Sequence, residues 1–169
     1  MRKSIAILLI AVLLAPSVSL FAKVDSKKAA YFGGSVGIFA GAKEPVQGTL
    51  DTVNPETLIL TTEAPFAGQR LQIPYAKILD LEYGQKAGRR VGAAIGYTVL
   101  LGPLGLLTLF SKKRNHYLTI GFKDEKGTDQ VAVLELGKDI VRVTLPIVET
   151  RSGKKIEYQD DEARKSAGR

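Results

Sequence analysis

A run of twenty uncharged and mostly apolar residues, Val91 to Phe110, lies between two basic clusters and limits what this chain of 169 residues can fold into. As one straight helix the run would be about 30 Å long at ~1.5 Å per residue, which matches the hydrocarbon core of a bilayer. A single crossing would place the sequence patterns before and after the run in different compartments. Because neither half has enough strands for an independent domain, the pattern favours a segment that returns to where it started.

The middle of this run carries a turn signal, Gly102-Pro103 followed by Gly105. The first arm would reach roughly 15 Å, about half of the hydrocarbon thickness. We therefore expect residues 86–115 to form an inserted, glycine-rich apolar helical hairpin that dips into one leaflet. A full span and packing of the run inside the protein are the alternatives. The residues expected to enter the membrane are Val91, Ile95, Val99, Leu100, Leu101, Leu104, Leu106, Leu107, Leu109 and Phe110.

Six basic residues and no acidic one lie between Tyr83 and Phe122. A hairpin would bring the two basic clusters to one level. Each basic side chain contributes on the order of 1 kcal/mol at an anionic membrane surface, before screening by salt. We expect this basic collar to bind anionic headgroups, and it consists of Lys86, Arg89, Arg90, Lys112, Lys113 and Arg114.

Four glycines at a spacing of four, Gly84, Gly88, Gly92 and Gly96, fall on one stripe of a helix. Such a stripe lets a second helix approach closely, as in small-xxx-small packing. The returning arm of the hairpin or a second copy of the chain could occupy it. The glycines are therefore predicted to serve helix packing.

The first 22 residues have the layout of a secretory signal peptide, with two basic residues, an apolar run over 5–14 and small residues after it. Cleavage after Ala22 would begin the mature chain at Lys23, and cleavage after Ser19 is the alternative. Removal of the signal lowers the net charge from +7 to +5, because two basic residues are lost. We expect an exported protein that is periplasmic or associated with a membrane of the cell envelope.

The chain contains no cysteine and one histidine, His116. Disulfides, cysteine-linked lipid anchors, thiolate metal sites, cysteine nucleophiles and sites with several histidine ligands are thereby excluded. The positive charge belongs to the flanks of the apolar run and not to a groove interleaved with aromatic residues, so nucleic-acid binding is not expected. No metal or cofactor is predicted.

Most of the remaining chain has strand patterns. Residues 29–42 are apolar and glycine-rich, which suggests an irregular first strand with a bulge at Gly33-Gly34. Residues 47–53 and 57–62 are rich in β-branched residues on either side of an Asn-Pro break, so they predict a β-hairpin.

Two further strands, Arg70–Pro74 and Ile78–Tyr83, are expected to pair with each other. In the second of them apolar and acidic residues alternate, which indicates a half-buried strand. One face carries Leu79, Leu81 and Tyr83, and the other carries Asp80 and Glu82.

After the apolar run, residues 115–122 and 130–136 predict another hairpin, with Gly127 in its turn. Residues 138–152 fit either a strand or a helix, and we interpret them as a helix with Asp139 in the N-terminal cap or first turn. Gly153 suits the C-terminal cap, and Pro146 is expected to kink the helix. Residues 159–169 are expected to be a charged, flexible tail.

The stretch RLQIPYAKILDLEYG, residues 70–84, resembles the strand, turn and strand of bacterial pleckstrin-homology-like (PH-like, GRAM-like) domains, and ETLILTT resembles the strand before it. The stretch YGQKAGRR, residues 83–90, is similar to one found in uncharacterised exported bacterial proteins. The resemblance implies a mainly β, α+β fold, which is a small antiparallel β-barrel or sandwich with a C-terminal helix. It implies a PH-like domain over 23–158, interrupted by the hairpin at 86–115, and a binding module more than an enzyme.

Catalytic patterns are weak by comparison. Gly84 to Arg89 lack the spacing of a phosphate-binding P-loop. Ser111 and His116 are not part of a nucleophile elbow, and Asp80 and Glu82 alternate with apolar residues as they would on a solvated sheet face. No catalytic residue is therefore predicted.

The sequence thus predicts a non-enzymatic binding module that docks on an anionic membrane face through the apolar hairpin and its basic collar. Its partners would be the lipid surface and, in addition, an envelope protein or a second copy of the chain. The alternative is a soluble periplasmic interaction or self-assembly protein that uses the glycine stripe for helix packing. A hydrolase is a distant third.

Overall fold

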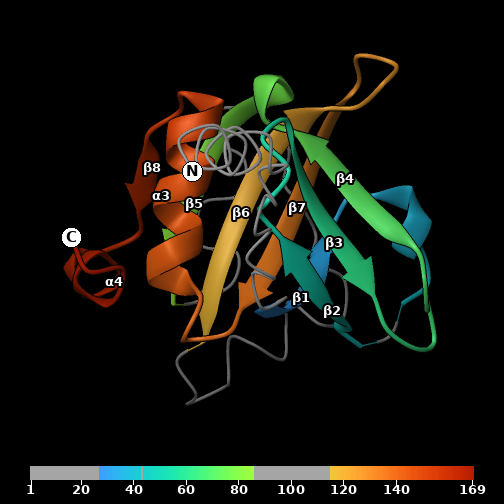
Figure 1. Cartoon of the computed structure of the whole chain (residues 1–169), viewed down its shortest axis with the longest axis horizontal. Helices are drawn as coiled ribbons and strands as arrows, with labels where there is room; N and C mark the ends of the chain where they lie inside the picture. Colours follow the sequence, from blue (N-terminus) through green and yellow to red (C-terminus); the bar gives the residue numbers. More distant parts are fainter. Residues whose placement is uncertain (1–26, 43, 86–114) are drawn as a thin grey trace, which may run out of the picture.

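The computed structural model of the chain describes residues 27–42, 44–85 and 115–169. These residues form a mainly β domain built on one sheet of eight strands in the order β4-β3-β2-β1-β7-β6-β5-β8. All neighbours are antiparallel except β5 and β8, which are parallel. Figure 1 shows α3 alongside β5 and β6, and the turn between β6 and β7 extending beyond the body of the sheet.

The strands are β1 (Lys27–Gly34), β2 (Val46–Asp51), β3 (Thr57–Thr62), β4 (Arg70–Pro74), β5 (Ile78–Gly84), β6 (His116–Lys123), β7 (Asp129–Leu136) and β8 (Ile156–Tyr158). The helices are α3 (Val141–Ser152) and α4 (Asp161–Ser166), with short 3-10 turns η1 (Gly37–Phe39) and η2 (Tyr75–Lys77).

One hydrophobic core lies on one face of this sheet and includes residues from all eight strands and both α-helices. Alternation of side chains places Leu58 and Leu60 of β3 in it, and Leu118 and Ile120 of β6 enter from the other half of the sheet. Helix α3 completes the core through a buried stripe of Val141, Thr144, Leu145 and Val148. The mainly β prediction is therefore confirmed, but the sheet is not closed into a barrel.

Both hairpins predicted from turn signals are confirmed. β2 pairs with β3, and β6 pairs with β7 around Gly127, which has a φ of 80°. Positive φ values are the reason that glycine is favoured at such turns.

The predicted pairing of Arg70–Pro74 with Ile78–Tyr83 is wrong, although both segments are strands. Among the described strands, β4 pairs only with β3 and ends one side of the sheet, while β5 lies near the other side between β6 and β8. The turn η2 carries the chain from one to the other. In β5, a register shift between Ile78 and Asp80 turns Ile78 into the core, together with the predicted Leu81 and Tyr83.

The first strand also differs from the prediction. It ends at Gly34 and the chain continues into η1, so residues 35–42 add no strand. The register shifts between Tyr31 and Gly33, which makes Phe32 the extra residue of the bulge. The Phe32 ring lies 5.0 Å from the ring of Tyr117, measured between centroids.

The C-terminal segment contains ordered structure where a flexible tail was expected. Asp160 accepts a hydrogen bond from the Ala163 amide and caps α4, and Ala163 is fully buried in the core. At the other helix, Asp139 is not the cap of α3, because the N-cap is Ile140 and no side chain bonds there. Gly153 is the C-terminal cap with a φ of 67°, as predicted, and α3 continues through Pro146.

Several predictions fall outside the described residues. These are the signal peptide at 1–22, the apolar run 91–110, the basic collar, and Gly88, Gly92 and Gly96. Gly84 is described, and it ends strand β5 instead of opening a helix. It is packed so closely that an added Cβ would lie 1.7 Å from Oε1 of Gln159. Within the described part of the chain, no helix has the length and hydropathy needed to cross a membrane.

Candidate functional site

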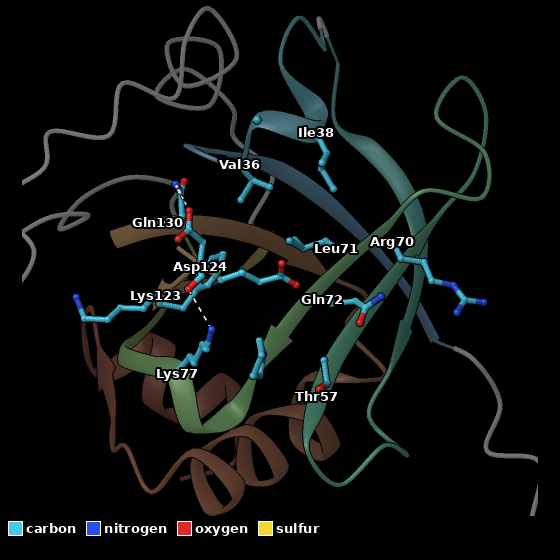
Figure 2. Close-up of a pocket in the computed structure, with 14 residues that line it drawn as sticks. Val36, Ile38, Thr57, Arg70, Leu71, Gln72, Lys77, Lys123, Asp124 and Gln130 are labelled. Carbon is cyan, nitrogen blue, oxygen red and sulfur yellow. Dashed lines mark hydrogen bonds between the residues drawn. The ribbon is translucent and has the colours of Figure 1, made fainter. Parts of the chain in front are cut away.

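A cavity of about 380 Å³ lies between the edge strand β4 and the turn that joins β6 to β7 (Figure 2). It is built from segments far apart in the sequence, because β4 and the β6–β7 turn approach each other only when the sheet has curved around its core. Its lining residues are Val36, Gly37, Ile38, Thr57, Arg70, Leu71, Gln72, Pro74, Lys77, Phe122, Lys123, Asp124, Glu125 and Gln130.

The β6–β7 turn is shaped by the carboxylate of Asp124. Oδ1 accepts hydrogen bonds from the backbone amides of Lys126 and Thr128, both at 2.8 Å, and Oδ2 accepts one from Nε2 of Gln130 at 3.3 Å. These bonds, above all those to the backbone, lower the pKa of Asp124. The carboxylate is therefore ionised and engaged with the turn, which makes it a structural group and not a general acid.

Lys77 of η2 lines the cavity and donates a hydrogen bond from Nζ to the backbone oxygen of Asp124 at 3.1 Å (Figure 2). This acceptor is neutral, so the bond positions the ammonium group without cancelling its charge. Lys123, in contrast, forms an ion pair with Asp129 at 2.6 Å. The side chain of Arg70 points away from the cavity. The cavity wall therefore contains one cation, Lys77, that no described carboxylate neutralises.

The described residues that flank 86–114 lie at the start of β6, which is the end of that strand away from the cavity. Gly84 at the end of β5 pairs with Tyr117 near the start of β6. The cavity, in contrast, is lined by Phe122 and Lys123 at the far end of that strand. β6 has eight residues, so at ~3.3 Å per residue the two ends are separated by roughly 25 Å.

Another polar cluster lies near the start of β6. The hydroxyl of Tyr83 is 2.6 Å from Nδ1 of His116 and 3.0 Å from the hydroxyl of Ser166. Ser166 donates its own hydrogen to the backbone oxygen of Ala163, 2.8 Å away. The cluster joins α4 to the sheet, and its hydroxyl groups are committed to one another and to the backbone.

The His116 imidazole has a lowered pKa, mainly because burial disfavours the charged form and secondly because of the nearby charge of Lys138. A lowered pKa in the folded state means that the unfolded chain binds the proton more tightly. Stability contributed by neutral His116 is therefore complete well above the ordinary pKa of about 6.5 and is lost as the pH falls through the folded pKa.

We expect the melting temperature of the protein to fall as the pH is lowered from about 7 to below about 6.5, and His116→Gln to reduce this fall. The glutamine keeps a hydrogen-bonding group beside Tyr83 but cannot take up the proton. Thermal unfolding of both proteins across this range measures the difference. Asp80 and Glu135 have pKa values raised by burial, and they act in the opposite direction at lower pH. Identical pH profiles would show that His116 does not contribute.

The other sequence candidates are not brought into the cavity lining. Asp80 and Glu82 lie on β5, where Asp80 bonds the Gly121 backbone and Glu82 accepts a hydrogen bond from Gln159 at 2.8 Å. Both are half-buried, whereas a solvated face was expected. Ser111 lies outside the described residues. Among the described residues there is no group of three or more potential metal-ligating side chains.

Sequence reasoning missed the cavity, because no motif marks it. The one local signal was the turn sequence DEKGTD, which predicted the hairpin but not the approach of its tip to β4. No model of a known protein family matches the sequence, and no curated protein matches it either.

Proposed function

We propose that this chain is an exported, non-enzymatic binding module that attaches to an anionic membrane face through the apolar run 91–110 and its basic collar. The described domain would then be held at the membrane surface by the end of the sheet where β5 finishes and β6 begins.

The observation that carries the proposal is the pairing of Gly84 with Tyr117 across adjacent antiparallel strands. The chain that leaves β5 must come back to the same end of the sheet to enter β6. A single crossing of a membrane would require these paired residues to lie on opposite sides of it. A run that enters one leaflet and returns meets the constraint, and it places both halves of the basic collar at the membrane surface.

We further propose that the domain is PH-like. Support comes from seven strands that follow one another around a single core, with α3 packed against it after the seventh. The resemblance of residues 70–84 implies a β-barrel or sandwich with a C-terminal helix, and these features support that proposal. The final strand β8 and helix α4 are additions to that pattern.

Binding to vesicles tests the membrane attachment. The mature chain, residues 23–169, is expected to sediment with vesicles containing phosphatidylglycerol and much less with pure phosphatidylcholine, and high salt should weaken the binding. Replacing 91–110 by a short glycine-serine linker should lower the affinity at least about tenfold, since burial of apolar side chains is lost. The linker can close the connection because Gly84 and Tyr117 are paired.

Two charge variants separate the basic collar from net charge. Changing the three collar residues Lys112, Lys113 and Arg114 to glutamine should weaken the preference for anionic vesicles. Changing the exposed residues Lys126, Lys154 and Lys155 to glutamine should have little effect, because they lie outside the collar. A folded mature chain that does not sediment with anionic vesicles, or a linker variant that binds as well as the parent, would contradict the proposal.

A further inference from the structure

We propose that the cavity beside β4 is a docking slot for an extended peptide segment of a partner protein, which pairs with β4 as an additional strand. The proposal does not depend on membrane attachment, because it uses only described residues, which lie far from the pair Gly84 and Tyr117.

The hydrogen-bonding pattern of β4 identifies which backbone groups are free. The Thr62 amide donates to the Gln69 oxygen and the Tyr75 amide donates to the Glu56 oxygen, both at 2.9 Å. Both bonds fit the register in which Leu60 is opposite Leu71. Hydrogen-bonded and non-hydrogen-bonded pairs alternate along an antiparallel ladder.

It follows that Leu71 and Ile73 direct their backbone groups toward β3, while Arg70 and Gln72 direct theirs toward the open edge. No described group forms a hydrogen bond with these outward amides or oxygens. Arg70 and Gln72 also line the cavity. Two donors and two acceptors, spaced two residues apart, thus line one wall of the cavity in the arrangement that another strand requires.

Pro74 sets the end of this edge. It occupies an outward position of the ladder, so its missing N–H costs no bond to β3. Because it has no N–H group, Pro74 also cannot donate a hydrogen bond to an added strand. Pairing is therefore centred on Arg70 and Gln72, and a short peptide suffices.

The other walls of the cavity favour a single extended segment as the occupant, and they disfavour the sheet edge of a second copy of the chain. Val36 and Ile38 rise on one side and Lys123 and Asp124 on another, as Figure 2 shows. A whole sheet brought edge-on to β4 would meet these walls, so the proposed occupant is one extended chain. Ile38 is 46% exposed, so it is available to contact apolar side chains of the bound segment.

Lys77 favours a bound segment that carries a negative charge. Its ammonium group bonds the neutral backbone oxygen of Asp124, and no described carboxylate pairs with it. An acidic side chain or a C-terminal carboxylate of the peptide would complement this charge. The fitting partner segment is therefore extended, free of proline where it pairs with β4, apolar at alternating positions and acidic at one position.

Selection from a displayed library of random heptapeptides tests this, with the mature chain as the target. We expect enriched peptides to alternate apolar and polar residues and to contain a carboxylate. A synthetic copy of an enriched peptide should slow hydrogen exchange at the amides of Arg70 and Gln72. The amides of Leu71 and Ile73, already bonded to β3, should change little.

The matched variants are Gln72→Pro and Gln72→Thr. Proline removes the outward N–H but no bond to β3, and it should weaken binding of the synthetic peptide at least about tenfold. Threonine keeps the N–H and should bind within about threefold of the parent. A melting temperature close to that of the parent shows that each variant is folded.

Lys77→Gln should weaken the binding of acidic peptides more than that of their amide counterparts.

Three results would overturn the proposal. The first is that the selection enriches no peptide, and the second is that the proline and threonine variants bind the peptide equally well. The third is that the bound peptide does not slow hydrogen exchange at the amides of Arg70 and Gln72. Because the variant with the linker at 91–110 retains the cavity, it should bind the same peptide, which separates failure of this inference from failure of membrane attachment.

Discussion

Replacing Gly34 by alanine is expected to lower the free energy of unfolding by about 3 kcal/mol or more, which is a large effect for one methyl group. Gly34 has a φ of 133°, a conformation that residues with a side chain rarely adopt. An added Cβ would lie 2.1 Å from the backbone oxygen of Val131 on the neighbouring strand. A backbone atom cannot rotate away as a flexible side chain can, so β1 and β7 must separate locally.

Urea unfolding of Gly34→Ala, with Gly37→Ala as the control, measures this cost. An added Cβ at Gly37 would have no atom within 4 Å. The control should therefore lie within about 0.5 kcal/mol of the parent. The Gly34 variant should also bind the selected peptide more weakly, since Val36 and Ile38 follow directly on the displaced segment. Equal stability of the two variants would contradict the packing of β1 on β7.

Replacing Ala163 by glutamate is expected to detach α4 and to destabilise the protein by about 1–3 kcal/mol. Ala163 is fully buried in the core, and a carboxylate there would lose its water without gaining a partner. The cost has an upper limit, because the short helix can leave its site. That release also breaks the bond between Ser166 and Tyr83 and the ion pair between Arg169 and Glu149.

Thermal unfolding and hydrogen exchange in residues 156–169 measure this effect. Lys165→Glu introduces the same side chain at an exposed position of the same helix and should change stability by less than about 0.5 kcal/mol. If residues 159–169 were a flexible tail, as their charge suggested, both variants would behave like the parent. Loss of protection in the Ala163 variant alone would establish that the segment is part of the fold.

The strands could be predicted where the signal is local. Alternation in 57–62 and β-branched residues beside a turn are properties of adjacent residues, and the structure confirms β2, β3, β6 and β7. The helix α3 was ambiguous by periodicity alone, since one stretch fitted both periods. Its buried stripe and the cap at Gly153 confirm the helical interpretation.

The pairing between strands was harder to predict from the sequence. Arg70–Pro74 and Ile78–Tyr83 are neighbours in sequence with a short connection, which ordinarily favours a hairpin. The structure instead uses η2 to pass from one side of the sheet to the other. Each of the two strands pairs with a different part of the sheet, and a local sequence pattern does not specify such partners.

Charge was a misleading guide at the C-terminus. Residues 159–169 are mostly polar, so composition alone indicated a solvated tail. The two small residues Ala163 and Ala167 are buried, and an alanine at helical spacing is too weak a hydrophobic signal to stand out among charges. Contact with a core formed by distant strands orders the segment.

The sequence by itself determined that the domain is mainly β, where its tight turns lie, and that it has no cysteine and a single histidine. These properties depend on residue types and on short-range backbone preferences. Only the tertiary structure decided that β4 is an edge, that Gly84 meets Tyr117, and that Lys77 reaches the turn at Asp124. Each of these depends on contacts between residues far apart in the chain, which form only when burial of one shared core curves the sheet around it.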